Sequence, residues 1–222
     1  MTVAIIDLGT NTFNLIVVQL HAAKKFSILH NDKISVKLGE GGIDKNILQP
    51  AAFDRGIAAI EKHLTKTNTF SPDKIVAFAT SAIRSAHNGN EFVAQIKSRF
   101  KLEVQIIDGN KEAELIYKGV KLGVTLPQQT CLIMDIGGGS TEFILANNRH
   151  ILWKSSFNLG VARLLDKFST SDPITSAEIL AITNYLHQQL QPLHEAVKKY
   201  PVHELIGSSG SFDTFAEIIS YK

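Results

Sequence analysis

The sequence predicts an α/β fold made of two similar halves, and three observations support this prediction. A strand-turn-strand pattern of apolar residues, an aspartate, glycine and hydroxyl residues, then further apolar residues occurs twice, at 3–18 and 131–145. Short apolar runs alternate with segments of helical periodicity. The length of 222 residues allows two small domains, each with its own core. The polar segment 126–130 is the expected link, so we predict domains at 1–125 and 126–222.

The first half opens with an antiparallel sheet. Residues 3–6 and 13–20 predict a hairpin, and the partly alternating run 25–38 predicts a third strand. Pro50 is placed to open a helix over 51–66, where apolar residues recur at helical spacing. The remaining elements expected in this half are a buried strand (74–80), a helix (88–99), a strand (102–107) and a helix (112–122). Residues 39–42 are interpreted as a connection rather than a flap over a ligand.

The second half repeats this outline. Strands are expected up to residue 145 and over 150–157, and a helical stretch begins within 158–163. A helical pattern over 175–197 contains Pro192, which we expect to kink or break it. Thr175 or Ser176 is suited to cap this helix ahead of Glu178. A last short strand, 203–206, leads into a Gly/Ser turn and a further helical segment.

The composition is that of a soluble globular protein, with 44% hydrophobic and 20% charged residues. No uncharged apolar run approaches the length of a membrane span, and the start of the chain lacks the pattern of a signal peptide, so a cytoplasmic location is expected. A net charge of +2 without a long basic run argues against nucleic-acid and membrane partners. Cys131 is expected to be a packed thiol, and the spacing of the eight histidines does not predict a zinc site.

The two turns have the composition of phosphate-binding loops. Glycines carry no Cβ, so backbone N–H groups can approach an anion closely. Asp7 and Asp135 stand at the strand ends that face the turns, where a carboxylate beside phosphate oxygens suits a hard divalent cation. A plain Gly-rich hairpin is the alternative for one turn alone, but the repeat favours a ligand held between two similar halves. The phosphate-binding candidates are Gly9, Thr10, Asn11 and Thr12 in the first turn and Gly137, Gly138, Gly139, Ser140 and Thr141 in the second.

Other candidates stand at strand ends and at the start of a helix. Arg84 follows the strand 74–80 and is suited either to grip a phosphate or to lie on a helix surface. Glu112 either complements a helix dipole or orients a water that attacks phosphorus. Ser208, Ser209 and Gly210 form either a flexible joint or a third anion-binding turn.

Taken together, these segments resemble the exopolyphosphatase and guanosine pentaphosphate phosphohydrolase family, within the superfamily of actin, sugar kinases and heat-shock ATPases. The resemblance implies a duplicated actin-like (ribonuclease H-like) fold with two mixed five-stranded sheets and a cleft between the domains. It also implies a hydrolase that releases terminal phosphate from inorganic polyphosphate or guanosine pentaphosphate, and a possible homodimer. The matching segments are 7–13, 79–84, 88–89, 112–120, 135–142 and 207–211.

The resemblance also implies roles for individual residues and a Mg²⁺ cofactor. Glu112 corresponds to the glutamate that activates water, and Glu142 to a second acid on the metal and water side. Asp7 and Asp135 correspond to the acids of the two turns, which with Glu142 make the predicted metal ligands. Arg84 corresponds to a phosphate-gripping arginine, and 137–140 to the phosphate cradle.

One departure from the family pattern concerns the catalytic segment. The family usually reads Glu-Glu-Ala-Arg, whereas this chain reads Lys111-Glu112-Ala113-Glu114, with Lys111 as a partial compensation for the lost arginine. The family also continues with further helices after the last Gly/Ser turn. Three alternatives to an exopolyphosphatase stay open: a guanosine pentaphosphate phosphohydrolase, a sugar or acetate-type kinase, and a non-catalytic sensor that binds polyphosphate or nucleotide.

Overall fold

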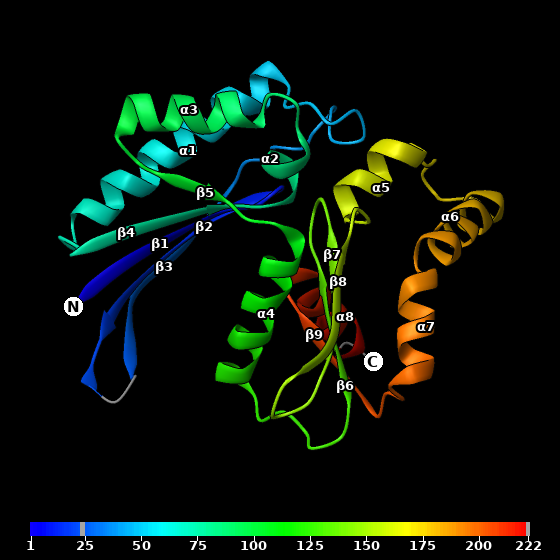
Figure 1. Cartoon of the computed structure of the whole chain (residues 1–222). Helices are drawn as coiled ribbons and strands as arrows, with labels where there is room; N and C mark the ends of the chain where they lie inside the picture. Colours follow the sequence, from blue (N-terminus) through cyan, green and yellow to red (C-terminus); the bar gives the residue numbers. More distant parts are fainter. Residues whose placement is uncertain (23–24, 221–222) are drawn as a thin grey trace. The chain divides into compact units, whose positions relative to one another are not determined.

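A computed structural model describes residues 1–22 and 25–220 of the chain (Figure 1). The chain divides into two compact units, Met1–Ile107 and Asp108–Lys222. Each unit contains one mixed sheet with helices packed on it, as the repeated sequence pattern predicts.

The first unit holds a five-stranded sheet with the strand order β3-β2-β1-β4-β5. Strand β1 is antiparallel to β2 and parallel to β4, so the chain reverses at the first turn and the ends of β1 and β4 reach the same edge. Helices α1 and α3 lie side by side over this sheet (Figure 1). The elements are β1 (Thr2–Leu8), β2 (Thr12–Leu20), β3 (Phe26–Ser35), α1 (Pro50–Asn68), β4 (Lys74–Ala79), α2 (Ser81–Ser85), α3 (Gly89–Phe100) and β5 (Val104–Ile106).

The core of the first unit forms where apolar residues of the sheet meet those of the helices. Phe13 and Leu15 of β2 and Ile60 of α1 are fully buried there. Phe92 of α3 packs edge-on against Phe53 of α1, with ring centroids 4.8 Å apart. The helical spacing of these side chains is therefore explained by contact with the sheet and with each other.

The second unit holds a four-stranded sheet with the order β8-β7-β6-β9. Strand β6 is antiparallel to β7 and parallel to β9, which repeats the pairing of β1 with β2 and β4. Helix α4 packs against β7 and β8 (Figure 1). The elements are α4 (Gly109–Gly123), β6 (Cys131–Ile136), β7 (Thr141–Ala146), β8 (Ile151–Phe157), α5 (Val161–Phe168), α6 (Ser176–Gln189), α7 (Gln191–Lys199), β9 (Glu204–Ser208) and α8 (Gly210–Ser220).

Two expectations about the second unit need correction. The division falls between Ile107 and Asp108, ahead of the boundary expected at 125/126, because α4 buries Ala113 and Tyr117 in the second core. The polar segment 126–130 is not a link between the units, since Leu126 is buried in the same core. In the described part of this unit the sheet has four strands rather than five, with α8 as the last described element after β9.

Several local predictions are confirmed. The helical pattern over 175–197 is broken at Leu190 into α6 and α7, with Pro192 in the first turn of α7. Thr175 and Glu178 form a reciprocal capping box at the start of α6. Cys131 is fully buried, and its thiol donates to the carbonyl of Ala146 at 3.3 Å, as expected for a packed cysteine. Within residues 1–22 and 25–220, no helix is both long enough and apolar enough to span a bilayer.

Candidate active site

The turn between β6 and β7 is fixed by the start of α5. Gly137 N–H donates to Ser140 C=O at 3.0 Å and closes the turn. The carbonyls of Gly137 and Gly138 accept from the N–H groups of Val161 and Ala162 at 3.0 and 2.8 Å. In a trans peptide the N–H group points opposite to the C=O group. The N–H groups of Gly138 and Gly139 therefore point away from α5, toward the side from which an anion could approach them.

Arg163 also holds this turn in place, a role that was not predicted from the sequence. The arginine is 6% exposed, its Nε donates to Gly139 C=O at 3.2 Å, and its backbone N–H donates to Gly138 C=O at 3.3 Å. The hydrogen bond to Gly139 C=O also directs the N–H of Ser140 to the outer side of the turn. This contact joins residues 24 positions apart, so no local sequence pattern signals the role of Arg163.

Glycine is required at Gly160 because the backbone of the turn passes so close. A Cβ at Gly160 would lie 2.3 Å from the carbonyl carbon of Gly138 and 2.4 Å from the nitrogen of Gly139. Thr141 adds a further restraint, since its buried Oγ1 donates to Leu159 C=O at 3.0 Å. The shape of the turn is therefore set by close backbone packing as well as by its own sequence.

A group of carboxylates lies beside this turn. Glu142 is opposite Asp135 in the β6–β7 register, is 2% exposed, and accepts a hydrogen bond from Ser156 Oγ at 2.6 Å. Burial, followed by the nearby charge of Glu112, raises the pKa of Glu142 to about 7. Glu112 reaches this place because it stands in the first turn of α4, which packs against β7 and β8. Glu142 therefore takes up and loses its proton in the neutral pH range.

Asp135 connects the turn to the third Gly/Ser segment. Parallel pairing of β6 with β9 places Ser208 opposite Asp135. Burial raises the pKa of Asp135, and hydrogen bonds from Ser209 and Ser208 oppose that rise. Ser209 Oγ also donates to the carbonyl of Ile136 at 3.1 Å, and Gly210 follows at the start of α8. The structure therefore brings the second and third predicted turns together within the second unit.

The first unit contains the remaining predicted residues. Asn14 lies opposite Asp7 in the β1–β2 register, and its Nδ2 donates to Asp7 Oδ2 at 3.1 Å. The turn closes through Gly9 N–H, which donates to Thr12 C=O at 3.2 Å. The carbonyls of Thr10 and Asn11 accept from the backbone of residues 36–39, so the N–H groups of Asn11 and Thr12 point away from that segment.

Arg84 lies at the same edge of the first sheet as this turn. Its Nη1 donates to the carbonyl of Ile107 at 3.1 Å, and the paired residues Leu8 and Ala79 end β1 and β4 at that edge. The guanidinium is therefore held near the carboxyl ends of the parallel strands, where ligands commonly bind in open α/β sheets.

Metal ligands were predicted at Asp7, Asp135 and Glu142. Only Asp135 and Glu142 belong to one unit, where they are cross-strand neighbours. In the part of the chain that the structure describes, no group of three or more His, Cys, Asp or Glu side chains is placed to hold a metal ion. Any metal bound here would therefore draw part of its coordination from water or from a ligand.

The fold and site together define a class of protein: a duplicated actin-like α/β protein with two Gly-containing turns and an acidic centre beside one of them. Comparison with known families is more specific. The Ppx/GppA phosphatase family matches residues 16–222, and this chain belongs to that family.

Individual relatives agree with this assignment. A Haemophilus influenzae protein provisionally named an exopolyphosphatase is 30% identical over 219 residues, covering 98% of this chain and 67% of its own. The crystal structure of an exopolyphosphatase from Cytophaga hutchinsonii has a TM-score of 0.95 at 38% identity, covering 98% of this chain and 70% of that one. The Aquifex aeolicus member of the family has a TM-score of 0.73 at 27% identity, covering 95% and 66%. The chain thus spans about two thirds of the length of these relatives.

Proposed function

We propose that this chain acts as an exopolyphosphatase, releasing the terminal phosphate of inorganic polyphosphate by hydrolysis. The observation that carries this proposal is the pair Glu112 and Glu142 beside the Gly137–Ser140 turn, in a chain of the Ppx/GppA phosphatase family. An anion nest next to paired carboxylates supplies the two things that hydrolysis of a phosphoanhydride needs. One is a holder for the phosphoryl group, and the other is a base for water.

In this mechanism the outward N–H groups of the second turn hold the oxygens of the terminal phosphate. Glu112 accepts the proton of the attacking water, and its charge is one cause of the raised pKa of Glu142, about 7. The N–H groups stabilise charge that develops on the phosphoryl oxygens. Ser208, Ser209 and Gly210, together with Arg84 and the first turn, are proposed as further phosphate contacts.

Mg²⁺ is the proposed cofactor, and the donor set of the second unit fits it. Asp135 and Glu142 offer carboxylate oxygens whose pKa values burial has raised, so a nearby divalent cation would favour their charged forms. Mg²⁺ in phosphoryl-transfer sites is usually held by one or two carboxylates, with water and substrate phosphates completing the shell. When bound it would neutralise charge on the phosphate. Asp7 is the ligand proposed from the first unit, and a cytoplasmic location and a homodimer are proposed on the sequence alone.

The test is phosphate release from long-chain polyphosphate with Mg²⁺, comparing the wild-type chain with Glu112→Gln. We expect the substitution to reduce turnover by about 10²- to 10⁴-fold, the range attributable to general base catalysis, with polyphosphate binding retained. Glu103→Gln is the matched control, because Glu103 is an exposed glutamate of the first unit paired with Lys97. Unchanged turnover in Glu112→Gln would refute the assignment of the base.

Parallel substrates separate the alternatives. Faster release from guanosine pentaphosphate than from polyphosphate would identify an alarmone hydrolase. Phosphate transfer from ATP to a sugar or acetate would identify a kinase. Binding of polyphosphate with no release from any substrate would identify a sensor.

A further inference from the structure

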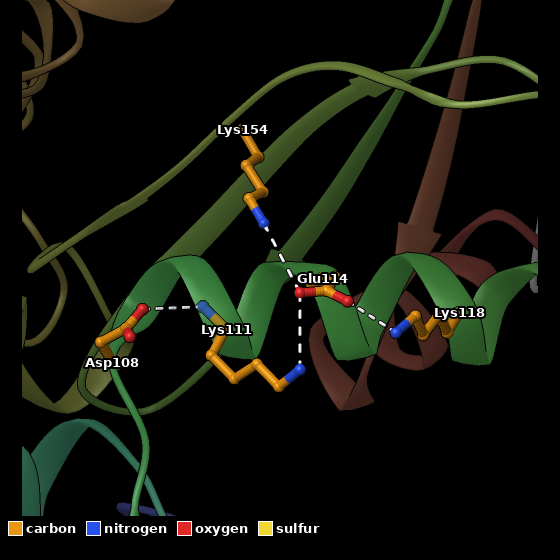
Figure 2. A network of polar contacts seen from close by, with 5 residues as sticks. All are labelled: Asp108, Lys111, Glu114, Lys118 and Lys154. Carbon is orange, nitrogen blue, oxygen red and sulfur yellow. Dashed lines mark hydrogen bonds and ion pairs between the residues drawn. The ribbon is translucent and has the colours of Figure 1, made fainter.

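Three lysines surround Glu114, the acid that replaces the usual family arginine (Figure 2). Lys118 Nζ lies 2.6 Å from Glu114 Oε1, while Lys111 Nζ and Lys154 Nζ lie 3.5 and 4.0 Å from Oε2. Lys111 and Lys118 come from α4 and Lys154 from β8. We call Lys111, Lys118 and Lys154 the lysine row. Its members all belong to the second unit.

The charges of this cluster do not balance. Among these four side chains there are two more positive than negative charges. Solvent-exposed ion pairs stabilise a fold by only about 0–1 kcal/mol each. The side chains of Lys111 and Lys118 are 47% and 58% exposed, so stability alone gives little reason for gathering them here.

The lysine row lies beside the carboxylate pair. Lys154 and Ser156 project from the same face of β8, about 7 Å apart, and Ser156 donates to Glu142. Lys111 adjoins Glu112 in the first turn of α4, and Lys118 lies seven residues further along, or about 10 Å down the helix axis. Their backbones are spread over α4 and β8, but their ammonium groups all lie within 4.0 Å of the Glu114 carboxylate, close to the place where the terminal phosphate is proposed to react.

We propose that the lysine row binds the internal phosphates of a polyphosphate chain whose terminal phosphate lies at the second turn. This inference rests on the proposed function and adds chain-length selectivity to it. Every internal phosphate carries negative charge, so cations gathered beside the reacting phosphate attract a chain that continues past it more strongly than a substrate that ends there. Lysine ammonium groups on flexible stems are point charges that bind phosphate oxygens without a fixed geometry.

Glu114 acts in this arrangement as the resident counter-ion. Its hydrogen bond and ion pair with Lys118, and then Lys111, hold the pKa of its carboxyl below the usual value, so it is charged at neutral pH. It keeps the lysines gathered when no polyanion is present and competes with phosphate for them. Removal of its charge should therefore strengthen binding of long chains.

The test measures kcat/KM for long-chain polyphosphate and for tripolyphosphate over a range of NaCl concentrations. In Lys118→Gln/Lys154→Gln we expect the long-chain to tripolyphosphate ratio to fall about tenfold, with a shallower salt dependence, because fewer counterions are released on binding. In Glu114→Gln we expect the ratio to rise and the salt dependence to steepen. Lys118→Arg should keep most of the selectivity, since it keeps the charge.

Lys198→Gln is the matched control, because Lys198 pairs with Glu195 at 2.8 Å on α7 in the same way as Lys118 pairs with Glu114. An unchanged ratio in the double variant, or an equal fall in Lys198→Gln, would overturn the proposal. Absence of phosphate release from every chain length would overturn the proposed function instead. In that case, binding of labelled long-chain polyphosphate is measured for the same variants. Weaker binding by the double variant than by Lys198→Gln would support the role of the lysine row, and equal binding would overturn it.

Discussion

The turns of the two units share a backbone design but differ in the residue opposite the aspartate. Gly9 N–H closes the first turn onto Thr12 C=O at 3.2 Å, and Gly137 N–H closes the second onto Ser140 C=O at 3.0 Å. The cross-strand partner of Asp7 is Asn14, whereas the partner of Asp135 is Glu142. The same position thus carries a neutral amide in one unit and an acid in the other.

This single difference changes the electrostatics of the two turns. Asn14 donates a hydrogen bond to the carboxylate of Asp7 from the neighbouring strand. Glu142 is instead buried beside Glu112, and its pKa rises to about 7. A repeated strand-turn-strand therefore supplies two turns of similar backbone, while the buried acid with a raised pKa lies in the second unit.

The largest expected effect comes from making the second turn neutral like the first. In Glu142→Gln the side chain still accepts from Ser156 but carries no charge and takes up no proton. We expect turnover to fall at least about a hundredfold, the lower end of acid-base contributions. We expect the melting temperature at pH 8 to be unchanged or higher, since a buried charge beside Glu112 is removed. Phosphate release and thermal unfolding measure the two effects.

The control for this comparison is Asn14→Ala in the first unit. It removes the exposed hydrogen bond to Asp7 and leaves Glu112 and Glu142 unchanged. We expect a smaller loss of turnover than in Glu142→Gln. A larger loss in Asn14→Ala would show that the acid chemistry does not lie in the second unit.

The next largest effect is expected from a change in the backbone packing that supports the second turn. Gly160→Ala places a Cβ against the backbone of Gly138 and Gly139, so the backbone must shift. We expect a loss of about 1–3 kcal/mol in the free energy of unfolding, as for other overpacked sites, and weaker phosphate binding. Gly119→Ala is the control, because its Cβ meets nothing within 4 Å on α4 and should stabilise the helix by about 0.5–1 kcal/mol. Equal unfolding free energies for the two variants would contradict the packing argument.

The stability of the two units should also change in opposite directions as the pH falls. In the first unit His63 is fully buried, with Nε2 3.1 Å from Phe13 C=O, and burial lowers its pKa below 6.5. As pH falls below 6.5 the unfolded state gains a proton that the folded state resists, so the first unit loses stability. In the second unit the folded state already binds a proton at Glu142 below about pH 7, whereas the unfolded state does so only near 4.5. The second unit therefore gains stability as pH falls from 7 to 4.5.

Hydrogen exchange of peptides from each unit, corrected for intrinsic rates at pH 5 and 7.5, measures this difference. His63→Gln should flatten the response of the first unit only, because glutamine still donates to Phe13 C=O without titrating. Glu142→Gln should flatten the response of the second unit only. If the stability of both units changed in the same direction with pH, His63 and Glu142 would not be the groups that control it.

Local sequence patterns predicted much of the fold and both turns. Turn chemistry and hydrophobic periodicity are local properties, which explains why the hairpins, the helices and the Thr175 cap agree with the structure. The domain division was missed because composition marks polar loops, and burial of Leu126 is a tertiary property. The supporting role of Arg163 and the lysine row depend on contacts between distant elements, which the sequence pattern does not reveal.

The smallest effect on stability is expected from changes at the first residues of two helices, one in each unit. Helix α6 follows the N-cap residue Thr175, whose Oγ1 accepts from Glu178 N–H at 3.3 Å, whereas α1 follows Gln49 without a side-chain cap and has Pro50 in its first turn. Thr175→Ala should cost about 1 kcal/mol of unfolding free energy, and Gln49→Ala about 0.5 kcal/mol or less.

The cap also lowers the pKa of Glu178 to about 2, first through the Thr175 hydroxyl. Its stabilisation is present above about pH 4.5 and is lost as pH falls through 2. Denaturant unfolding at pH 7 and 3 should therefore show a smaller gap between wild type and Thr175→Ala at the lower pH, and a constant gap would exclude the Glu178 contribution.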